Sequence, residues 1–203
     1  MYQIILASES PRRKEIMDTM GIRYKVITSN VEEVVEENVP EEMVQAIARL
    51  KTEEVLKKQS QLYPEQQDVI ILGADTMVFY GENALGKPQD EQDAVRMLSM
   101  LSEDSHNVIT GVSIIIANRY GFEERISFAV STKVTVQPLT LEQILDYIAT
   151  GEPMDKAGAY AIQGKFGIYI KEIAGDYYNI VGFPISKINE VLLQKGIDIK
   201  KLK

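Results

Sequence analysis

Short apolar runs rich in β-branched residues alternate along this chain with segments of helical periodicity. This alternation is typical of an α/β protein. Strands are expected at residues 2–6, 22–28, 69–72, 77–80, 108–117, 122–136 and 166–173. Helices are expected at residues 11–20, 40–59, 91–101, 141–149 and 184–195. Turn signals at 81–83 and 118–121 indicate antiparallel hairpins, whereas other strands are separated by helices, so we predict a mixed β-sheet flanked by helices.

The chain has 203 residues, and no stretch rich in Pro, Gly and Ser divides it. We therefore predict one domain over residues 1–203, with at most two small lobes. The sequence contains no cysteine and one histidine, His106. This composition excludes a disulfide scaffold, a cysteine nucleophile, thiolate metal sites and a three-histidine zinc site.

The formal net charge is −8, which disfavours sequence-independent binding of nucleic acid because that needs a basic surface. No apolar stretch approaches the ~18 residues of a membrane span, and we expect that the first residues are not a signal peptide. We expect a cytoplasmic protein that does not cross a membrane.

Two arginines open the helix expected at 11–20, where Ser10 is the expected N-cap and Pro11 the first residue. A helix N-terminus favours an anion, whereas an arginine there is disfavoured by roughly 0.3–1 kcal/mol. Arg12 and Arg13 are explained if they bind a phosphate or a carboxylate. The alternative is that both side chains lie in solvent or pair with nearby acids.

Lys51 falls on an apolar stripe of the helix expected at 40–59. Such a lysine is paired, extends its ammonium to solvent, or faces a cleft where it could bind phosphate. Asp75 follows an apolar strand, a position where a carboxylate needs a partner or a metal unless it caps a turn. Lys87, in a Gly-Lys-Pro loop, is a weaker candidate because such lysines are usually solvated.

The segment 155–164 combines small residues with Gln163, whose amide can donate to and accept from the edge of a base. The alternative is an ordinary irregular loop. His106 precedes a strand and is expected to be structural rather than catalytic.

Any metal bound by the acids Glu32, Glu33 or Asp75 should be a hard cation, Mg²⁺ or Mn²⁺, because no sulfur ligand is present. Together with the scattered cations, such acids suggest a site for a nucleoside diphosphate or triphosphate. The sequence has neither a GxxxxGK[ST] loop nor a GxGxxG motif, so it supports neither a P-loop nor a Rossmann site.

Five short motifs, in order along nearly the whole chain, resemble the Maf family of nucleoside triphosphate pyrophosphatases. They are LASESPRR at 6–13, GADT at 73–76, GKP at 86–88, DKAGAYAIQG at 155–164 and the segment 175–184. The resemblance implies an elongated two-lobed α/β fold with a cleft between the lobes, similar to inosine triphosphate pyrophosphatases. It also implies a homodimer, a divalent cation, Mg²⁺ or Mn²⁺, and hydrolysis of a nucleoside triphosphate substrate to monophosphate and pyrophosphate.

The resemblance also implies roles for individual residues. Asp75 matches the family's catalytic aspartate, described as a proton acceptor, and Glu33 matches a glutamate that handles metal or water, so both are expected metal ligands. The positions that match triphosphate-binding residues are Ser8, Arg13, Lys51 and Lys87. The two lysines are expected to act in catalysis by stabilising the leaving pyrophosphate.

Arg12, Thr76 and Gln163 are similar to the family branch that acts on dTTP and UTP. The branch that acts on 7-methyl-GTP tends to carry Trp, Gln and Glu at these points. The resemblance therefore implies a dTTP/UTP pyrophosphatase, with modified pyrimidine triphosphates as related substrates. Two departures, Glu103 in place of a usual glycine and Phe183 in place of a leucine, are expected to affect loops or packing.

The alternative from another functional class is a non-enzymatic interaction protein, because Maf-like proteins have been associated with septum formation and the arrest of cell division. The presence of Asp75, Lys51 and Lys87 together favours the enzyme, since a binding module has little need of all three.

Overall fold

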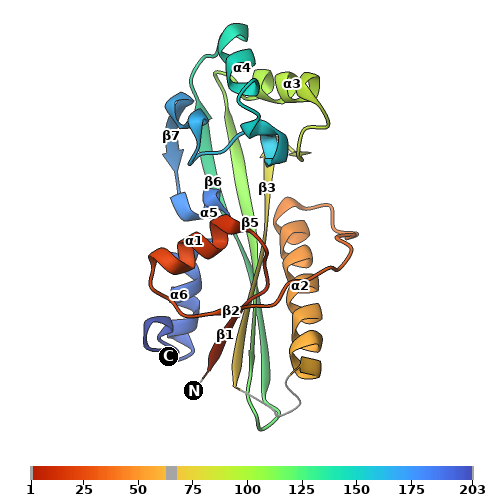
Figure 1. Ribbon diagram of the computed structural model, residues 1–203, viewed down its shortest axis with the longest axis vertical. Helices are drawn as coiled ribbons and strands as arrows, with labels where there is room; N and C mark the ends of the chain where they lie inside the picture. Colours follow the sequence, from red (N-terminus) through yellow and green to blue (C-terminus); the bar gives the residue numbers. More distant parts are fainter. Residues whose placement is uncertain (1, 63–67, 203) are drawn as a thin grey trace. The chain divides into compact units, whose positions relative to one another are not determined.

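The computed structural model describes residues 2–62 and 68–202. Within them lies a seven-stranded sheet with the order β2-β1-β3-β5-β6-β7, in which β4 pairs with β3 (Figure 1). Strand β1 runs parallel to β2 and β3, whereas β4 is antiparallel to β3 and β7 to β6. The prediction of a mixed sheet is therefore confirmed. The strands are β1 Gln3–Leu6, β2 Lys25–Val26, β3 Val69–Tyr80, β4 Asn83–Leu85, β5 Ser105–Ala117, β6 Glu123–Val136 and β7 Ile170–Ala174.

The α-helices of the described residues are α1 Pro11–Thr19, α2 Pro40–Leu62, α3 Glu91–Leu101, α4 Leu141–Ile148, α5 Tyr177–Val181 and α6 Ile185–Gln194. Apart from α5, they begin and end within three residues of the predicted positions. Local capping explains two of the starts. The Asp90 carboxylate accepts from the backbone N–H of Asp93 at 2.8 Å before α3, and Thr140 and Gln143 form a reciprocal capping box at α4.

Three expectations about strands are wrong. The strand expected at 22–28 covers only Lys25–Val26. The strands expected at 69–72 and 77–80 are one continuous strand, β3, so the Gly-Ala-Asp-Thr motif lies inside it. The strand expected at 166–173 begins at Ile170, because residues 165–169 form a 3-10 helix that buries Phe166. The short helix α5 was not expected.

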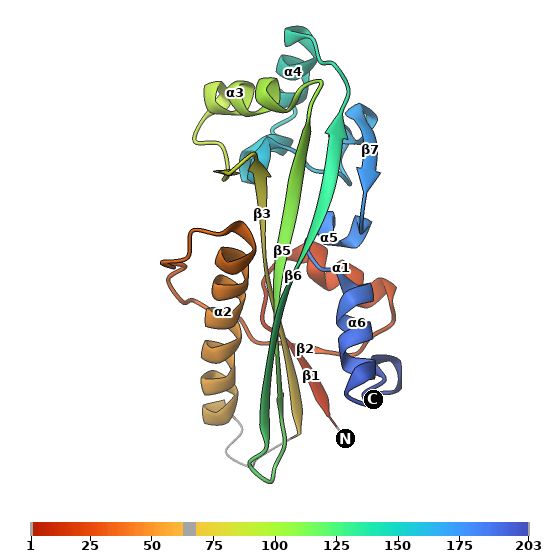
Figure 2. The ribbon, with the colours of Figure 1, turned by 180° about the vertical axis from the view of Figure 1, so that it is seen from behind.

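The chain divides into two compact units. The first comprises Met1–Asp75, Thr110–Val130 and Gly182–Lys203, and the second comprises Thr76–Ile109 and Ser131–Val181. In the first unit, α2 covers one face of the sheet, and α1 and α6 cover the other (Figures 1 and 2). Ile5 and Ile71 pack with Val55 of α2, whereas their buried neighbours Ile4 and Ile70 alternate to the opposite face. Burial on both faces explains why these strands are apolar throughout.

Two glycines allow α2 to lie very close to the sheet. A Cβ atom on Gly111 would lie 2.3 Å from the backbone of Val44, and one on Gly73 would lie 2.5 Å from the Thr52 methyl group. The hydroxyl groups of Thr52 and Ser113 are hydrogen-bonded at 2.7 Å in this contact. The glycine of the Gly-Ala-Asp motif is therefore needed for packing of the helix that carries Lys51.

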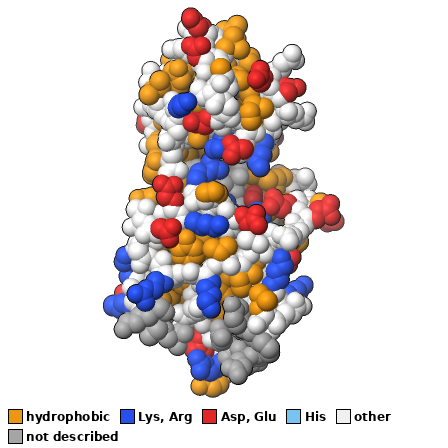
Figure 3. Space-filling model, in the orientation of Figure 1, with side chains coloured by type: hydrophobic (Ala, Val, Ile, Leu, Met, Phe, Trp, Pro, Cys, Tyr) orange, Lys and Arg blue, Asp and Glu red, His pale blue; other side chains and the backbone are white. Residues whose placement is uncertain are grey.

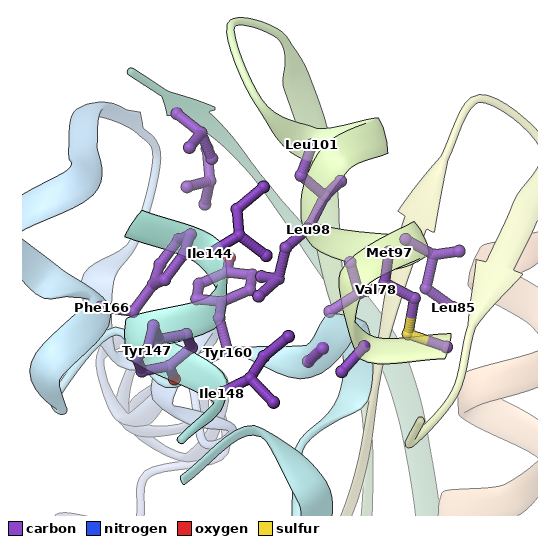
Figure 4. Close-up of a cluster of buried hydrophobic side chains, with 14 of the residues drawn as sticks. Val78, Leu85, Met97, Leu98, Leu101, Ile144, Tyr147, Ile148, Tyr160 and Phe166 are labelled. Atoms are coloured by element: carbon purple, nitrogen blue, oxygen red, sulfur yellow. The ribbon is translucent and has the colours of Figure 1, made fainter. Parts of the chain in front are cut away.

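The second unit has its own core of buried aliphatic and aromatic side chains (Figure 4). The Phe166 ring lies 5.0 Å from the ring centroids of both Tyr147 and Tyr160. His106 is 2% exposed, and its Nε2 is hydrogen-bonded to the Tyr160 hydroxyl at 2.7 Å. This setting is structural, as expected from the sequence.

Candidate active site

Lys51 joins two acids in the first unit. Its ammonium donates to Asp75 Oδ1 at 2.8 Å and lies 2.8 Å from Glu33 Oε1. The Lys51 side chain is 14% exposed and that of Asp75 12%, whereas half of the Glu33 side chain is exposed. Of the explanations considered for a lysine on a core-facing stripe, pairing is the one that the structure shows. Asp75 is likewise paired at its buried position in β3 rather than capping a turn.

The two carboxylates and Lys51 come from different parts of the chain. Asp75 lies on β3, Lys51 on α2, and Glu33 in the segment 27–39, which has no helix or strand. The close packing of α2 over Gly73 brings the Lys51 ammonium to the Asp75 carboxylate. The contact between α2 and the sheet thus fixes Lys51 and Asp75 relative to each other, whereas Glu33 needs separate anchors.

Arg13 is buried beside Ser8 and Gly182. Its Nε donates to the Gly182 carbonyl oxygen at 2.8 Å, and its Nη1 donates to the Ser8 hydroxyl at 3.1 Å. Burial lowers the pKa of Arg13, and the carboxylates of Asp75 and Glu33 act in the opposite direction. Arg13 therefore belongs electrostatically to the Asp75 site, and the alternative that it lies in solvent is wrong.

The side chain of Ser10 does not cap α1 as expected. Ser10 occupies the N-cap position without a capping hydrogen bond from its own side chain to the described helix. Its backbone N–H instead donates to the Ser8 hydroxyl oxygen at 3.2 Å. Arg12 is partly exposed on the same turn. Ser8 thus connects the turn to the buried Arg13 guanidinium.

The acids at Lys51 provide a donor set that suits a hard cation. The Glu33 and Asp75 oxygens that contact Lys51 Nζ are no farther apart than twice 2.8 Å. Within residues 2–62 and 68–202, no group of three or more His, Cys, Asp or Glu side chains is arranged to hold a metal ion. Mg²⁺ commonly takes one or two carboxylates and completes its shell with water and substrate phosphates. Glu33 and Asp75 fit such a site, and Glu32 is an exposed neighbour.

Thr76, Lys87 and Gln163 belong to the second unit, in which Lys87 and Gln163 are exposed. The backbone N–H of Gly158 donates to the Gly86 carbonyl oxygen at 3.0 Å. This hydrogen bond joins the loop of Lys87 to the segment 155–164 that carries Gln163. Ala159 in this segment has a φ of +60°, which is a strained backbone conformation for an alanine. Such strain is often found at functional sites.

Two residues that the sequence did not single out hold the Gln163 loop. The Glu152 carboxylate accepts from the backbone N–H of Lys165 at 3.0 Å and from the Tyr147 hydroxyl at 2.8 Å. The Tyr147 hydroxyl oxygen in turn accepts from the backbone N–H of Ala161 at 3.3 Å. The loop is therefore fixed on both sides of Gln163. Gly164 allows this contact with Glu152, because a Cβ there would lie 2.1 Å from Glu152 Oε1.

Acidic and basic side chains are interspersed on the face shown in Figure 3. The described residues on that face form no large field of one sign. Among the described parts of the chain, no helix combines the length and apolar character that a membrane crossing requires.

A family model described as Maf-like protein matches residues 3–195. The chain belongs to the Maf family. A protein of Lachnoclostridium phytofermentans named dTTP/UTP pyrophosphatase is 48% identical and covers 99% of both chains. One of Agathobacter rectalis with the same name is 45% identical over 98% of this chain and all of its own length. Among solved structures, the Staphylococcus aureus Ham1 protein is 16% identical, with a TM-score of 0.47 and coverage of 95% of this chain and 99% of that chain.

The two departures from the Maf pattern have clear structural settings. Glu103 has a φ of +59°, a left-handed backbone that explains why glycine is usual at this position. Phe183 is fully buried beside Gly182, the residue that accepts from Arg13. Both departures therefore lie in a turn and in packing, as expected.

Proposed function

We propose that this Maf protein is a pyrophosphatase that hydrolyses dTTP and UTP, and modified pyrimidine triphosphates, to the monophosphate and pyrophosphate. The observation that carries the proposal is the placement of Lys51 between Asp75 and Glu33. Relatives at 48% and 45% identity over nearly the full chain are named dTTP/UTP pyrophosphatases, which supports this choice of substrate.

In the proposed reaction, water attacks the α-phosphorus in line with the leaving pyrophosphate. Asp75 holds or deprotonates the attacking water, because its carboxylate is the buried acid of the site. Arg13 and Lys51 stabilise the charge that grows on the pyrophosphate. Ser8 orients the Arg13 guanidinium through its hydroxyl group.

A divalent cation, Mg²⁺ or Mn²⁺, supplies charge neutralisation for the phosphates when bound. Glu33 and Asp75 are the residues that would hold it. A carboxylate bound to a cation is a weak base, so metal ligand and general base are alternative roles for Asp75. A solvent isotope effect on turnover that is present in wild type and lost in Glu33→Gln would favour Glu33 as the residue that handles the proton.

The roles of the remaining residues stay predictions from the family resemblance. We expect Lys87 to bind the triphosphate, Gln163 and Thr76 to recognise the pyrimidine, and Arg12 to help fix the ligand. The homodimer and the cytoplasmic location also stay predictions. The described contacts give no independent support to the alternative, a non-enzymatic cell-division protein.

A product assay tests the proposal. Purified protein with Mg²⁺ or Mn²⁺ is given dTTP, UTP, CTP, GTP and 7-methyl-GTP, and pyrophosphate and monophosphate are measured. We expect pyrophosphate from dTTP and UTP, and none from the folded Asp75→Asn variant. Cleavage of 7-methyl-GTP alone would overturn the roles given to Arg12, Thr76 and Gln163. Cleavage of no substrate would overturn the proposed function.

A further inference from the structure

Glu33 lies in a segment that cannot hold a side chain in place by itself. Residues 27–39 form no helix or strand, and they run alongside α2 in Figures 1 and 2. Half of the Glu33 side chain is exposed, so packing does not fix it. A carboxylate that must lie within hydrogen-bonding distance of Lys51 therefore depends on contacts elsewhere in the segment.

Those contacts come from Glu54 on α2. Its Oε2 accepts from the Ser29 hydroxyl in a short hydrogen bond and from the backbone N–H of Asn30 at 2.8 Å. The Ser29 hydroxyl oxygen accepts in turn from the backbone N–H of Val31 at 3.2 Å. One carboxylate thus fixes three consecutive residues, the last of which is two residues before Glu33.

Lys58 completes the anchor. Its ammonium pairs with Glu54 Oε1 at 3.0 Å and donates to the Thr28 carbonyl oxygen at 2.9 Å. The Ser29 hydroxyl first, and then Lys58 and the Asn30 N–H, hold the pKa of Glu54 below its ordinary value. Glu54 is therefore ionised at neutral pH. Its hydrogen bonds are charge-assisted, and such bonds are stronger than those between neutral groups.

The anchor and the catalytic lysine lie on the same face of α2. Lys51, Glu54 and Lys58 are separated by three and then four residues, a spacing that places their side chains on adjacent turns of a helix. The helix face that directs Lys51 to Asp75 therefore also holds the segment that carries Glu33. Arg49, which lies 3.5 Å from Glu37, adds a weaker contact farther along.

We propose that Glu54, assisted by Lys58, is a positioning residue that fixes Thr28–Val31 so that the Glu33 carboxylate lies against Lys51 beside Asp75. The role in the reaction rests on the proposed pyrophosphatase function, whereas the placement of the segment does not. The alternative is that Glu54 only adds a surface contact and contributes nothing to Glu33.

The chain offers a matched control at the neighbouring residue. Glu53 is also an ion-paired glutamate of α2, with its Oε1 2.6 Å from Arg125 Nε on β6. Its carboxylate is joined to β6 rather than to residues 28–31, although the residue borders a cavity together with residues 34–37. Glu54→Gln and Glu53→Gln remove the same charge from the same helix. A purely structural effect would be similar in both, whereas positioning of Glu33 would be lost only in Glu54→Gln.

The first experiment compares steady-state hydrolysis of dTTP by wild type, Glu54→Gln, Glu53→Gln and Ser29→Ala. We expect kcat to fall about tenfold to 100-fold in Glu54→Gln, because small misplacement of a catalytic group has effects of this size. KM should change less than kcat, Ser29→Ala should lose less than Glu54→Gln, and Glu53→Gln should match wild type. Equal kcat values in Glu54→Gln and Glu53→Gln would overturn the proposal.

A double-mutant cycle then tests whether Glu54 acts through Glu33. The residual kcat of Glu33→Gln should not fall further in the Glu33→Gln/Glu54→Gln variant, because no carboxylate remains to be positioned. Multiplication of the two losses would overturn the proposed route through Glu33.

Hydrogen exchange separates failure of this inference from failure of the proposed function. Backbone amides of residues 30–33 should exchange faster in Glu54→Gln than in Glu53→Gln. If wild type hydrolyses no triphosphate, faster exchange would still show that Glu54 places the Glu33 segment. Unchanged exchange would overturn the positioning whatever the enzyme does.

Discussion

The Lys51 ammonium lies 2.8 Å from a carboxylate oxygen of Asp75 and 2.8 Å from one of Glu33, so two acids share one cation. The same two carboxylates would hold a divalent cation. Lys51 and such a cation would therefore compete for the same two carboxylates in the absence of substrate. We therefore expect Lys51 to weaken metal binding in the absence of substrate but to increase turnover.

Lys51→Met should lower turnover and tighten metal binding. Loss of the charge that stabilises pyrophosphate should reduce kcat about 100-fold or more. Removal of the competing ammonium should tighten Mn²⁺ binding without nucleotide by about tenfold, because two unpaired carboxylates attract a cation more strongly. Mn²⁺ binding is measured by paramagnetic resonance. Lys57→Met, on an exposed position of the same helix, is the control, and unchanged Mn²⁺ affinity in Lys51→Met would contradict the shared contacts.

Arg13→Lys should destabilise the fold although the charge is retained. Lysine has one ammonium and cannot donate to the Gly182 carbonyl and the Ser8 hydroxyl with the geometry of the guanidinium fork. We expect the free energy of unfolding to fall by about 2–3 kcal/mol, because buried polar groups lose their partners. Denaturant unfolding measures this loss. Arg23→Lys, at an exposed position, should be neutral, and equal stability of both variants would contradict the role of the fork.

Much of the fold was predictable because local signals agree with burial. The helix Glu91–Leu101 was predicted to the residue, since Asp90 caps it and its apolar side chains lie on one face. The strand expected at 166–173 was wrong at its start, because a short apolar run can be either a strand or a buried helical turn. Phe166 packs against the rings of Tyr147 and Tyr160, neither of which belongs to its own 3-10 helix, so this burial cannot be read from the local sequence.

The site was predictable only in part, for a related reason. Lys51 and Asp75 interrupt apolar patterns, so each was visible as a charge that needs a partner. The anchor of the Glu33 segment was not visible, because Glu54 and Ser29 are 25 residues apart and neither interrupts a pattern. Long-range hydrogen bonds to irregular segments leave no periodic trace in a single sequence.

Glu103→Gly should stabilise the second unit. Glu103 has a φ of +59°, where a side chain has a penalty of roughly 1–2 kcal/mol that glycine avoids. Glycine also makes the unfolded chain more flexible, which offsets part of this gain. We expect a net gain of about 0.5–1 kcal/mol in thermal or denaturant unfolding. Glu103→Ala keeps the Cβ atom and should show no such gain, so an equal gain in both variants would assign the effect to charge rather than backbone.

The stability of the second unit should depend on pH through His106. Burial lowers the pKa of His106 to about 4, and the nearby Asp104 carboxylate only partly opposes this shift. An imidazole in the unfolded chain titrates near 6.5, so between these values the unfolded state binds a proton that the folded state does not. The contribution of neutral His106 to the free energy of unfolding is therefore complete above about pH 6.5 and falls as the pH decreases toward 4, by roughly 3 kcal/mol in total.

His106→Gln tests this pH dependence, because it keeps a group that can hydrogen-bond to the Tyr160 hydroxyl but does not titrate. In urea unfolding at pH 7 and at pH 4.5, the loss of stability should be smaller in His106→Gln than in wild type. Asp104 is the carboxylate that interacts with His106, and the other carboxylates should contribute equally to both proteins. Identical losses would therefore show that His106 does not cause the difference.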